Sequence, residues 1–241
     1  MEAFRAKLLQ KREVAEGTRA FRLEKPPNFQ FRAGQFIDLT LIDPPEMDAG
    51  GSTRTFTLAS APYENELLIA TRMREHSAFK RTLAALPAGT EMMVEGPMGS
   101  FTLHSNAAKP AVFLAGGIGI TPFLSICKQA AQERLPHRIY LFYSNHRPED
   151  AAFLDTLEEL EKVNPCFRLI ATMTNMDQSK RAWSGETGFI DAALMRRYIE
   201  IPGEAICSIA GPPEMVEAMR QMLIGAGADP DNLRTEEFSG Y

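Results

Sequence analysis

The order of apolar and polar residues divides the chain into two parts. From Phe4 to Phe101, apolar and polar residues alternate over short runs, as around Phe21 and Leu23, and Gly and Pro interrupt them. Such runs predict antiparallel strands, and their close spacing predicts a small barrel or sandwich. Strands are expected at residues 35–41, 54–59, 66–73 and 91–95, with one short helix over 77–86.

In the second part, wholly apolar runs of strand length alternate with longer segments whose apolar residues recur at helical spacing. Strands are expected at residues 111–115, 138–143, 168–172, 205–210 and 233–238. One helix is expected to open near Pro148 and another at Pro212-Pro213, with acidic residues in the first turn. Repeated strand–helix units predict a doubly wound parallel sheet. We therefore expect two domains, residues 1–106 and 107–241.

The two expected helices carry apolar residues at helical spacing. These residues are Phe153, Leu154, Leu157 and Leu160 in the first helix, and Met215, Met219, Met222 and Leu223 in the second. A methionine stripe of this kind is typical of a packed core, and we assign the stripe to the core.

The most informative stretch joins the apolar run 111–115 to a glycine turn and then to a helical pattern. The turn contains Gly116, Gly117 and Gly119, and Thr121-Pro122 follows. Glycines let the backbone approach a ligand, and the amides at a helix start suit an anion such as a pyrophosphate. A plain strand-to-helix turn is the alternative. A membrane span is not favoured, because the uncharged run is shorter than about 20 residues and contains Gly and Pro.

Composition narrows the function classes. The chain has 241 residues with 44% apolar and 24% charged residues, typical of a globular protein, and its net charge of −5 argues against nucleic-acid binding. Charges near the N-terminus argue against a signal peptide. Cys127, Cys166 and Cys207 are too far apart for a disulfide framework, an iron–sulfur site or a zinc site, so no metal is expected. We expect a cytoplasmic protein.

Three motifs follow one another along the chain. They are Arg54-Thr55-Phe56-Thr57, the turn Gly116–Pro122, and Ala210-Gly211-Pro212-Pro213-Glu214-Met215. Smaller signals accompany them at Ala33-Gly34-Gln35-Phe36, Glu95-Gly96-Pro97 and Glu237-Phe238. In this order and spacing the chain resembles the ferredoxin–NADP reductase superfamily over essentially its whole length. The resemblance implies an antiparallel flavin-binding β-barrel followed by a doubly wound α/β domain that binds NAD(P).

The first motif is expected to hold the flavin. Arg54 supplies a cation for the flavin phosphate, Phe56 an aromatic surface for the ring, and Thr57 a hydrogen bond at N5. The strand period places Arg54 and Phe56 on one face and Thr57 on the other. The superfamily motif is Arg-x-Tyr-Ser, so stacking is kept here while a tyrosine hydroxyl contact is lost.

Further flavin contacts are implied by the resemblance. The backbone of Ile69-Ala70-Thr71-Arg72 is expected to hold the pyrimidine edge. Ser77 matches a phosphate-binding serine, although a serine there is also an ordinary helix cap, and the neighbouring His76 is either a contact or a loop histidine. Phe238 or Tyr241 is expected to cover the flavin face, so Thr57 and Phe238 are the candidate catalytic residues. FAD is favoured over FMN.

The second domain is expected to bind the nicotinamide nucleotide. The expected contacts are Gly116, Gly117, Gly119, Thr121 and Pro122 for the pyrophosphate, Gly211, Pro212, Pro213 and Met215 near the nicotinamide, and Ser144 and Asn145 at a strand end. Ala210 departs from the common Cys-Gly-Pro pattern, and we expect altered nicotinamide positioning with hydride transfer retained. The ends of the second and third strands of this domain read Tyr143-Ser144-Asn145 and Thr174-Asn175, without an arginine at the position expected for a 2′-phosphate contact. This favours NADH over NADPH, although Lys180 and Arg181 lie on a nearby loop.

The expected function is an NAD(P)H-dependent flavoprotein oxidoreductase. It passes a hydride to bound FAD and electrons to a separate protein such as a ferredoxin, a flavodoxin or an oxygenase component, because the chain carries no cluster of its own. Arg72, Lys80 and Arg81 are candidates for a basic docking patch or for a solvated face. The alternatives are a free-flavin reductase and a non-catalytic flavin- or nucleotide-binding subunit of a larger redox complex.

Overall fold

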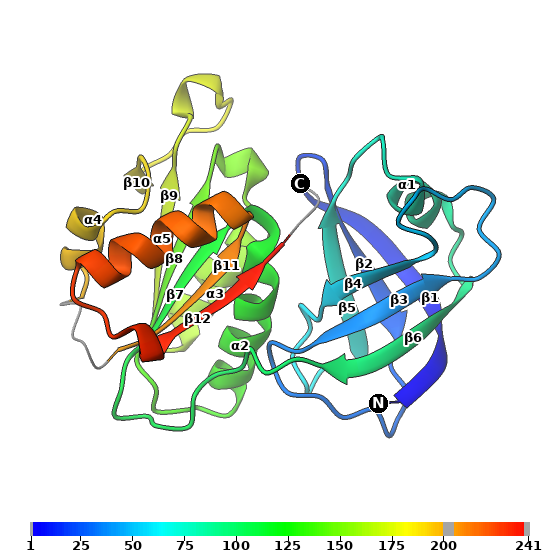
Figure 1. Ribbon diagram of the computed structural model, residues 1–241, viewed down its shortest axis with the longest axis horizontal. Helices are drawn as coiled ribbons and strands as arrows, with labels where there is room; N and C mark the ends of the chain where they lie inside the picture. Colours follow the sequence, from blue (N-terminus) through cyan, green and yellow to red (C-terminus); the bar gives the residue numbers. More distant parts are fainter. Residues whose placement is uncertain (1, 200–204, 239–241) are drawn as a thin grey trace.

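The computed structural model describes residues 2–199 and 205–238, and it contains two sheets that lie side by side (Figure 1). The first sheet, with the neighbouring helix α1 (Ala78–Ala85), has the strand order β4-β3-β6-β1-β2-β5. Its strands are β1 (Glu2–Ala15), β2 (Thr18–Glu24), β3 (Phe36–Leu41), β4 (Thr53–Thr57), β5 (Glu66–Arg72) and β6 (Glu91–Met98). All pairs are antiparallel, and the edge strands β4 and β5 are in contact, so the sheet curls into the expected barrel.

The longest strand was not among the expected ones. β1 pairs with β6 through residues 2–7 and with β2 through residues 8–15, so it bends across the barrel. Among residues 3–15 only Ala6 and Leu8 are buried, and six of the 14 residues of the strand are charged. Phe4, Ala6 and Leu8 alternate with Arg5 and Lys7, which is a strand pattern, so the local signal for this strand was present and was overlooked.

The second sheet is parallel and doubly wound, as predicted, with the order β10-β9-β8-β7-β11-β12. Its strands are β7 (Ala111–Gly116), β8 (Ile139–Asn145), β9 (Phe167–Met173), β10 (Glu186–Thr187), β11 (Ile206–Gly211) and β12 (Leu233–Glu237). Its helices are α2 (Ile120–Gln132), α3 (Leu154–Val163), α4 (Ala192–Arg196) and α5 (Pro213–Gly225). Strand order reverses between β7 and β11, and ligands of such sheets bind at this point beyond the carboxyl ends.

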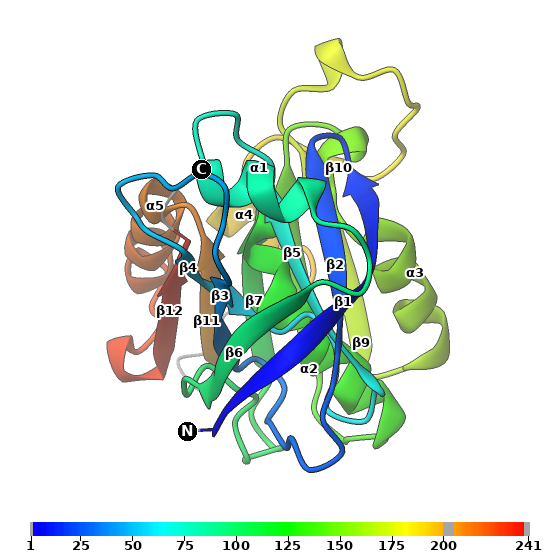
Figure 2. The same ribbon diagram turned by 90° about the vertical axis from the view of Figure 1, so that its right-hand side faces the viewer.

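Alternate residues of the central strand β7 point to two different cores. Phe113 and Ala115 pack with α2 and α3, whereas Val112 and Leu114 pack with α4 and α5. Figure 2 shows α3 and α5 on opposite sides of the sheet. Met219 and Leu223 are buried in the second core, and Met215 and Met222 pack against it, so the methionine stripe is core as predicted.

The predicted start of the helix near Pro148 is wrong. Residues 148–150 form a single 3₁₀ turn, and α3 begins only at Leu154. Arg147 pairs with Asp150 across the turn, and Phe153 adopts a left-handed φ of 61°. The chain therefore changes direction between the turn and the helix, which the helical spacing of the apolar residues does not reveal.

Polar contacts join the two domains. The Ser125 hydroxyl of α2 donates to the Ser60 carbonyl at 2.6 Å, and Lys128 forms a 3.1 Å ion pair with Glu64. The first sheet ends at Met98 and the second begins at Ala111, and the domain boundary at 106/107 stays a prediction within this segment. Within residues 2–199 and 205–238, none of the helices combines the length and apolar character needed to cross a membrane.

Candidate functional site

Two cavities meet at the β7–α2 connection. The first, of about 110 Å³, lies against the barrel and is called the barrel cavity. The second, of about 430 Å³, lies at the carboxyl ends of the parallel strands and is called the strand-end cavity. Arg72 lines both cavities, and consecutive residues of the connection are divided between them: Gly116 and Gly117 line the second, and Ile118 and Thr121 the first.

The barrel cavity gathers most of the residues assigned to the flavin. Its walls come from β4, β5, α1, the β7–α2 connection and the chain end after β12. The residues expected at the flavin that line it are Arg54, Phe56, Thr57, Ala70, Thr71, Arg72 and Phe238. Thr121, which was expected at the pyrophosphate of the nucleotide, lines this cavity and not the strand-end cavity. Segments more than 180 residues apart in sequence, at Arg54 and Phe238, therefore meet at one place, as the motif order predicts.

The cations of this cavity are arranged around the start of α1. Arg54 forms an ion pair with Asp48, and its guanidinium lies 5.2 Å from the ring centre of Phe79. Ser77 is the N-cap of α1, and its hydroxyl accepts a 3.3 Å hydrogen bond from the backbone amide of Lys80. The pKa of Lys80 is lowered, first by burial and then by the nearby charges of Arg74 and Arg54. Together these groups suit a phosphate.

Lys80 has a different place from the one expected. It lines the barrel cavity, as Arg72 does, whereas Arg81 lies outside and pairs with Glu46. The three residues therefore do not form one exposed docking patch, and Lys80 is a cation of the site that sequence reasoning assigned elsewhere.

Phe56 serves the core as well as the cavity. Its side chain is only 7% exposed, and its ring centre lies 5.9 Å from that of Phe79. The strand period was expected to place Phe56 and Thr57 on opposite faces of β4. Both residues nevertheless line the barrel cavity.

Glu236 is the residue that sequence reasoning missed. The Thr57 hydroxyl donates to its Oε1 at 3.3 Å, and its Oε2 is buried without a hydrogen-bond partner among the described residues. Burial raises the pKa of Glu236 to about 7, against a smaller lowering by the Thr57 hydrogen bond. The strand period could have found it, since residues 236 and 238 share a face and Phe238 was expected to face the flavin.

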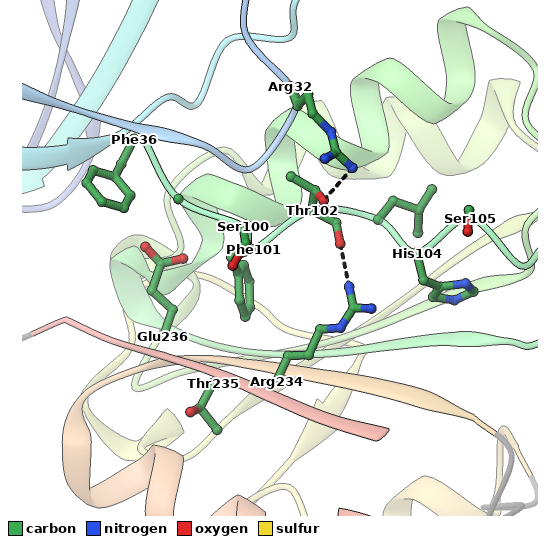
Figure 3. A pocket seen from close by; sticks show the side chains of 12 residues that line it. Arg32, Phe36, Ser100, Phe101, Thr102, His104, Ser105, Arg234, Thr235 and Glu236 are labelled. Carbon is green, nitrogen blue, oxygen red and sulfur yellow. Dashed lines mark hydrogen bonds between the residues drawn. The ribbon is translucent and has the colours of Figure 1, made fainter. Parts of the chain in front are cut away.

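Glu236 also borders a hollow between the domains, with a volume of about 760 Å³ (Figure 3). Arg32 donates to the Thr102 hydroxyl at 3.0 Å, and Arg234 donates to the Thr102 carbonyl at 2.9 Å. Figure 3 shows both guanidinium groups directed at Thr102 from opposite sides. Glu236 thus stands between this hollow and Thr57 of the barrel cavity.

The strand-end cavity collects residues from the ends of β7 and β8, from Pro212 just after β11, and from α5. The expected residues that line it are Gly116, Gly117, Ser144, Asn145, Pro212 and Met215. His146, Thr174, Phe189 and Glu214 also line it. Phe189 is 79% exposed at its edge, where an aromatic ring can pack on a base. No local signal in the sequence marks Phe189, because the adjacent Ile190 is apolar too and is buried.

The sequence pattern suggested that the glycines of the β7–α2 turn face a ligand. In the structure, not all of them do. A Cβ on Gly119 would lie 2.3 Å from the carbonyl oxygen of Ala210, and one on Gly116 would meet the Met215 sulfur at 2.1 Å. A Cβ on Gly211 would meet the Gly116 backbone at 3.2 Å. Gly119 and Gly211 let the turn pack on the end of β11, and Gly116 leaves room for Met215 of α5. Only Gly117, with φ of 53°, has open space beside it.

The remaining expected residues lie outside the cavity walls. Ile69 and Pro122 are buried in β5 and α2, Pro213 begins α5, and His76 is exposed before α1. Gly119 and Gly211 act through packing. Tyr241 lies outside the described residues.

The residues present fit FAD and a nicotinamide nucleotide. Arg54 and Lys80 supply cations, Thr57 a hydroxyl and Phe238 an aromatic side chain in one cavity. The adjoining cavity is lined by Gly116 and Gly117, just before the start of α2.

Comparison with known proteins leads to the same two domains. Residues 5–103 match the family model of the oxidoreductase FAD-binding domain, and residues 113–221 match that of the oxidoreductase NAD-binding domain. The glycine betaine monooxygenase reductase subunit of Chromohalobacter salexigens is 27% identical over 92% of this chain and 60% of its own length. The propane 2-monooxygenase reductase component of Rhodococcus jostii is 28% identical over 89% of this chain and 57% of its own. The chain thus spans about three-fifths of these relatives.

Other relatives match along their full length. Ferredoxin–NADP reductase B of Sorangium cellulosum is 28% identical over 98% of both chains. The crystal structure of a ferredoxin NADP⁺ reductase from Neisseria gonorrhoeae with bound FAD and NADP superposes with a TM-score of 0.82 and 24% identity, over 98% of this chain and 99% of that one. The chain belongs to the ferredoxin–NADP reductase-like superfamily, with an FAD-binding barrel followed by an NAD-binding domain.

Proposed function

We propose that the chain takes a hydride from NADH onto FAD and passes electrons to a separate protein, as the reductase of an oxygenase system. The observation that carries the proposal is the division of the β7–α2 connection between two cavities that share Arg72. A nucleotide bound at the strand ends and a flavin bound at the barrel are then neighbours, which is the geometry that a direct hydride transfer needs.

The proposed roles divide binding from chemistry. FAD, when bound, accepts a hydride and releases electrons one at a time. Arg54 and Lys80 bind its phosphate, and Phe238 covers a ring face. Thr57 places its hydroxyl beside the ring and donates its proton to Glu236, whose carboxyl group can hold or release a proton at Oε1 near neutral pH.

NADH is the proposed donor because the strand-end cavity offers little to a 2′-phosphate. Glu214 and Asp150 line it, and Arg72, at the border with the barrel cavity, is the one Lys or Arg among its lining residues. Lys180 and Arg181 are exposed and do not line the cavity; their backbone amides are bound by Glu149 and Ser179. Carboxylates near the ribose repel a phosphate.

The proposed acceptor is a protein, because the similar monooxygenase reductases are components that serve partners. The purified protein is expected to keep its yellow FAD through gel filtration. It should then reduce cytochrome c through an added [2Fe–2S] ferredoxin with NADH, and adding free FMN in place of the ferredoxin should give a much lower rate. Loss of colour on purification, with activity restored only by excess FMN, would instead identify a free-flavin reductase.

We also propose that the protein is cytoplasmic. All three cysteines are free thiols, two of them buried, as suits a reducing cytoplasm.

A further inference from the structure

The second part of the loop between β3 and β4, residues 46–52, returns to the cations of the barrel cavity. Asp48 Oδ1 pairs with Arg54, and Asp48 Oδ2 lies 3.4 Å from the Ser77 hydroxyl and 3.5 Å from the Phe79 amide. A guanidinium, a helix N-cap hydroxyl and an amide of the first helical turn therefore converge on one carboxylate. The same set of donors is suited to a phosphate.

The loop is held in this position by its own backbone. Arg54 donates to the carbonyls of Gly50 and Gly51 at 2.6 and 3.0 Å, and the Gly50 amide donates to Asp48 Oδ1 at 3.0 Å. Burial works to raise the pKa of Asp48, but hydrogen bonds from Arg54, Gly50 and Phe79 outweigh it and hold the pKa below its usual range. The side chain is therefore an anion at neutral pH.

We propose that Asp48 is an internal competitor for the flavin phosphate and thereby sets how tightly the protein holds phosphate-bearing flavins. The proposal rests on the proposed function, which assigns Arg54 and the start of α1 to that phosphate. Two anions cannot share the same three donors, because they would repel one another at contact distance. The phosphate reaches Arg54 and Ser77 only when Asp48 leaves, and Gly50 and Gly51 give the loop the freedom to move.

A carboxylate that merely holds Arg54 in place would have the opposite effect. Removing such a holder loosens the guanidinium and weakens flavin binding. Removing a competitor strengthens binding, and only for flavins that carry a phosphate. The sign of the effect and its dependence on the phosphate therefore decide between the two roles.

FMN and riboflavin are the matched probes, because they differ only in the phosphate. Flavin-free protein is titrated with each, and binding is followed by quenching of flavin fluorescence. In the Asp48→Asn variant, FMN should bind about tenfold more tightly than in the wild type, since a charged competitor is lost, while riboflavin should be unchanged. Glu46→Gln is the control: it removes a charge from the same loop, but Glu46 pairs with Arg81 and not with the phosphate donors.

Three results would overturn the proposal: an unchanged FMN affinity, a weaker FMN affinity, or equal tightening of FMN and riboflavin. Hydrogen exchange on the wild type gives a second test that needs no variant. FMN should speed exchange of the Gly50 amide by removing its Asp48 acceptor, and riboflavin should not; unchanged exchange contradicts the competitor role. Whether NADH reduces the bound flavin is measured separately, so failure of the proposed function is distinguishable from failure of this one.

Discussion

Gly119→Ala is expected to lose most NADH-dependent reduction of FAD and to lower the thermal stability of the protein. The added Cβ would lie 2.3 Å from the Ala210 oxygen and 2.7 Å from the Gly211 nitrogen, which are backbone atoms that cannot rotate away. The start of α2 must then move from the end of β11, at a cost of about 1–3 kcal/mol in unfolding free energy. A shift of ~1 Å in the bound nucleotide can slow hydride transfer about a hundredfold.

Gly225→Ala is the matched control, because a Cβ there meets nothing within 4 Å. Melting temperature and the single-turnover rate with NADH are measured for both variants, together with FAD content. An unchanged rate and melting temperature for Gly119→Ala would show that the turn does not depend on its packing against β11.

Glu236→Gln is expected to slow the reoxidation of the reduced protein by ferricyanide about a hundredfold, the usual size of a general-base effect. In the wild type this rate should rise as pH passes about 7, because only the ionised carboxylate can take a proton through Thr57. Glutamine takes no proton, so reoxidation of the variant should be slow, and its rate should not depend on pH over the same range.

Glu236 also affects the pH dependence of stability. It keeps its proton up to about pH 7 in the folded protein, whereas the ordinary pKa of an exposed glutamate is 4.5. The folded state binds the extra proton, so stability falls as pH rises from about 4.5 to 7, by at most about 3 kcal/mol. The melting temperature of Glu236→Gln should therefore exceed that of the wild type by more at pH 8 than at pH 5.

Glu237→Gln is the control for both measurements, because Glu237 is the exposed neighbour on the same strand. It should change neither the reoxidation profile nor the pH dependence of melting. If Glu236→Gln behaves like this control, Glu236 is only a wall of the cavity.

Much of the fold could be predicted because its signals are local. The apolar run of β7, the glycine turn and the helical spacing of α2 adjoin one another in sequence, and the predicted bounds of β7 and β11 fall within one residue of those in the structure. β1 was missed although Phe4, Ala6 and Leu8 alternate with charged residues along it. The start of α3 was misplaced because the left-handed Phe153 turns the chain just before the helix, and the apolar spacing does not show this.

The site was harder to predict where its chemistry comes from distant contacts. Arg54 and Thr57 belong to a motif that the sequence identifies through its order and spacing with the other two motifs. Glu236 matters because the barrel buries it against Thr57, 179 positions away. Gly119 is required by Ala210, which no local pattern reveals, so the sequence suggested a ligand where the structure has a close backbone contact.

An anaerobic titration of the purified protein, followed at the flavin absorbance with NADH and NADPH in parallel, tests the central claim most directly. We predict that one equivalent of NADH bleaches the bound FAD rapidly and that NADPH does so much more slowly. A yellow protein that neither nucleotide bleaches would contradict the account, and it would leave a protein that binds flavin without reducing it.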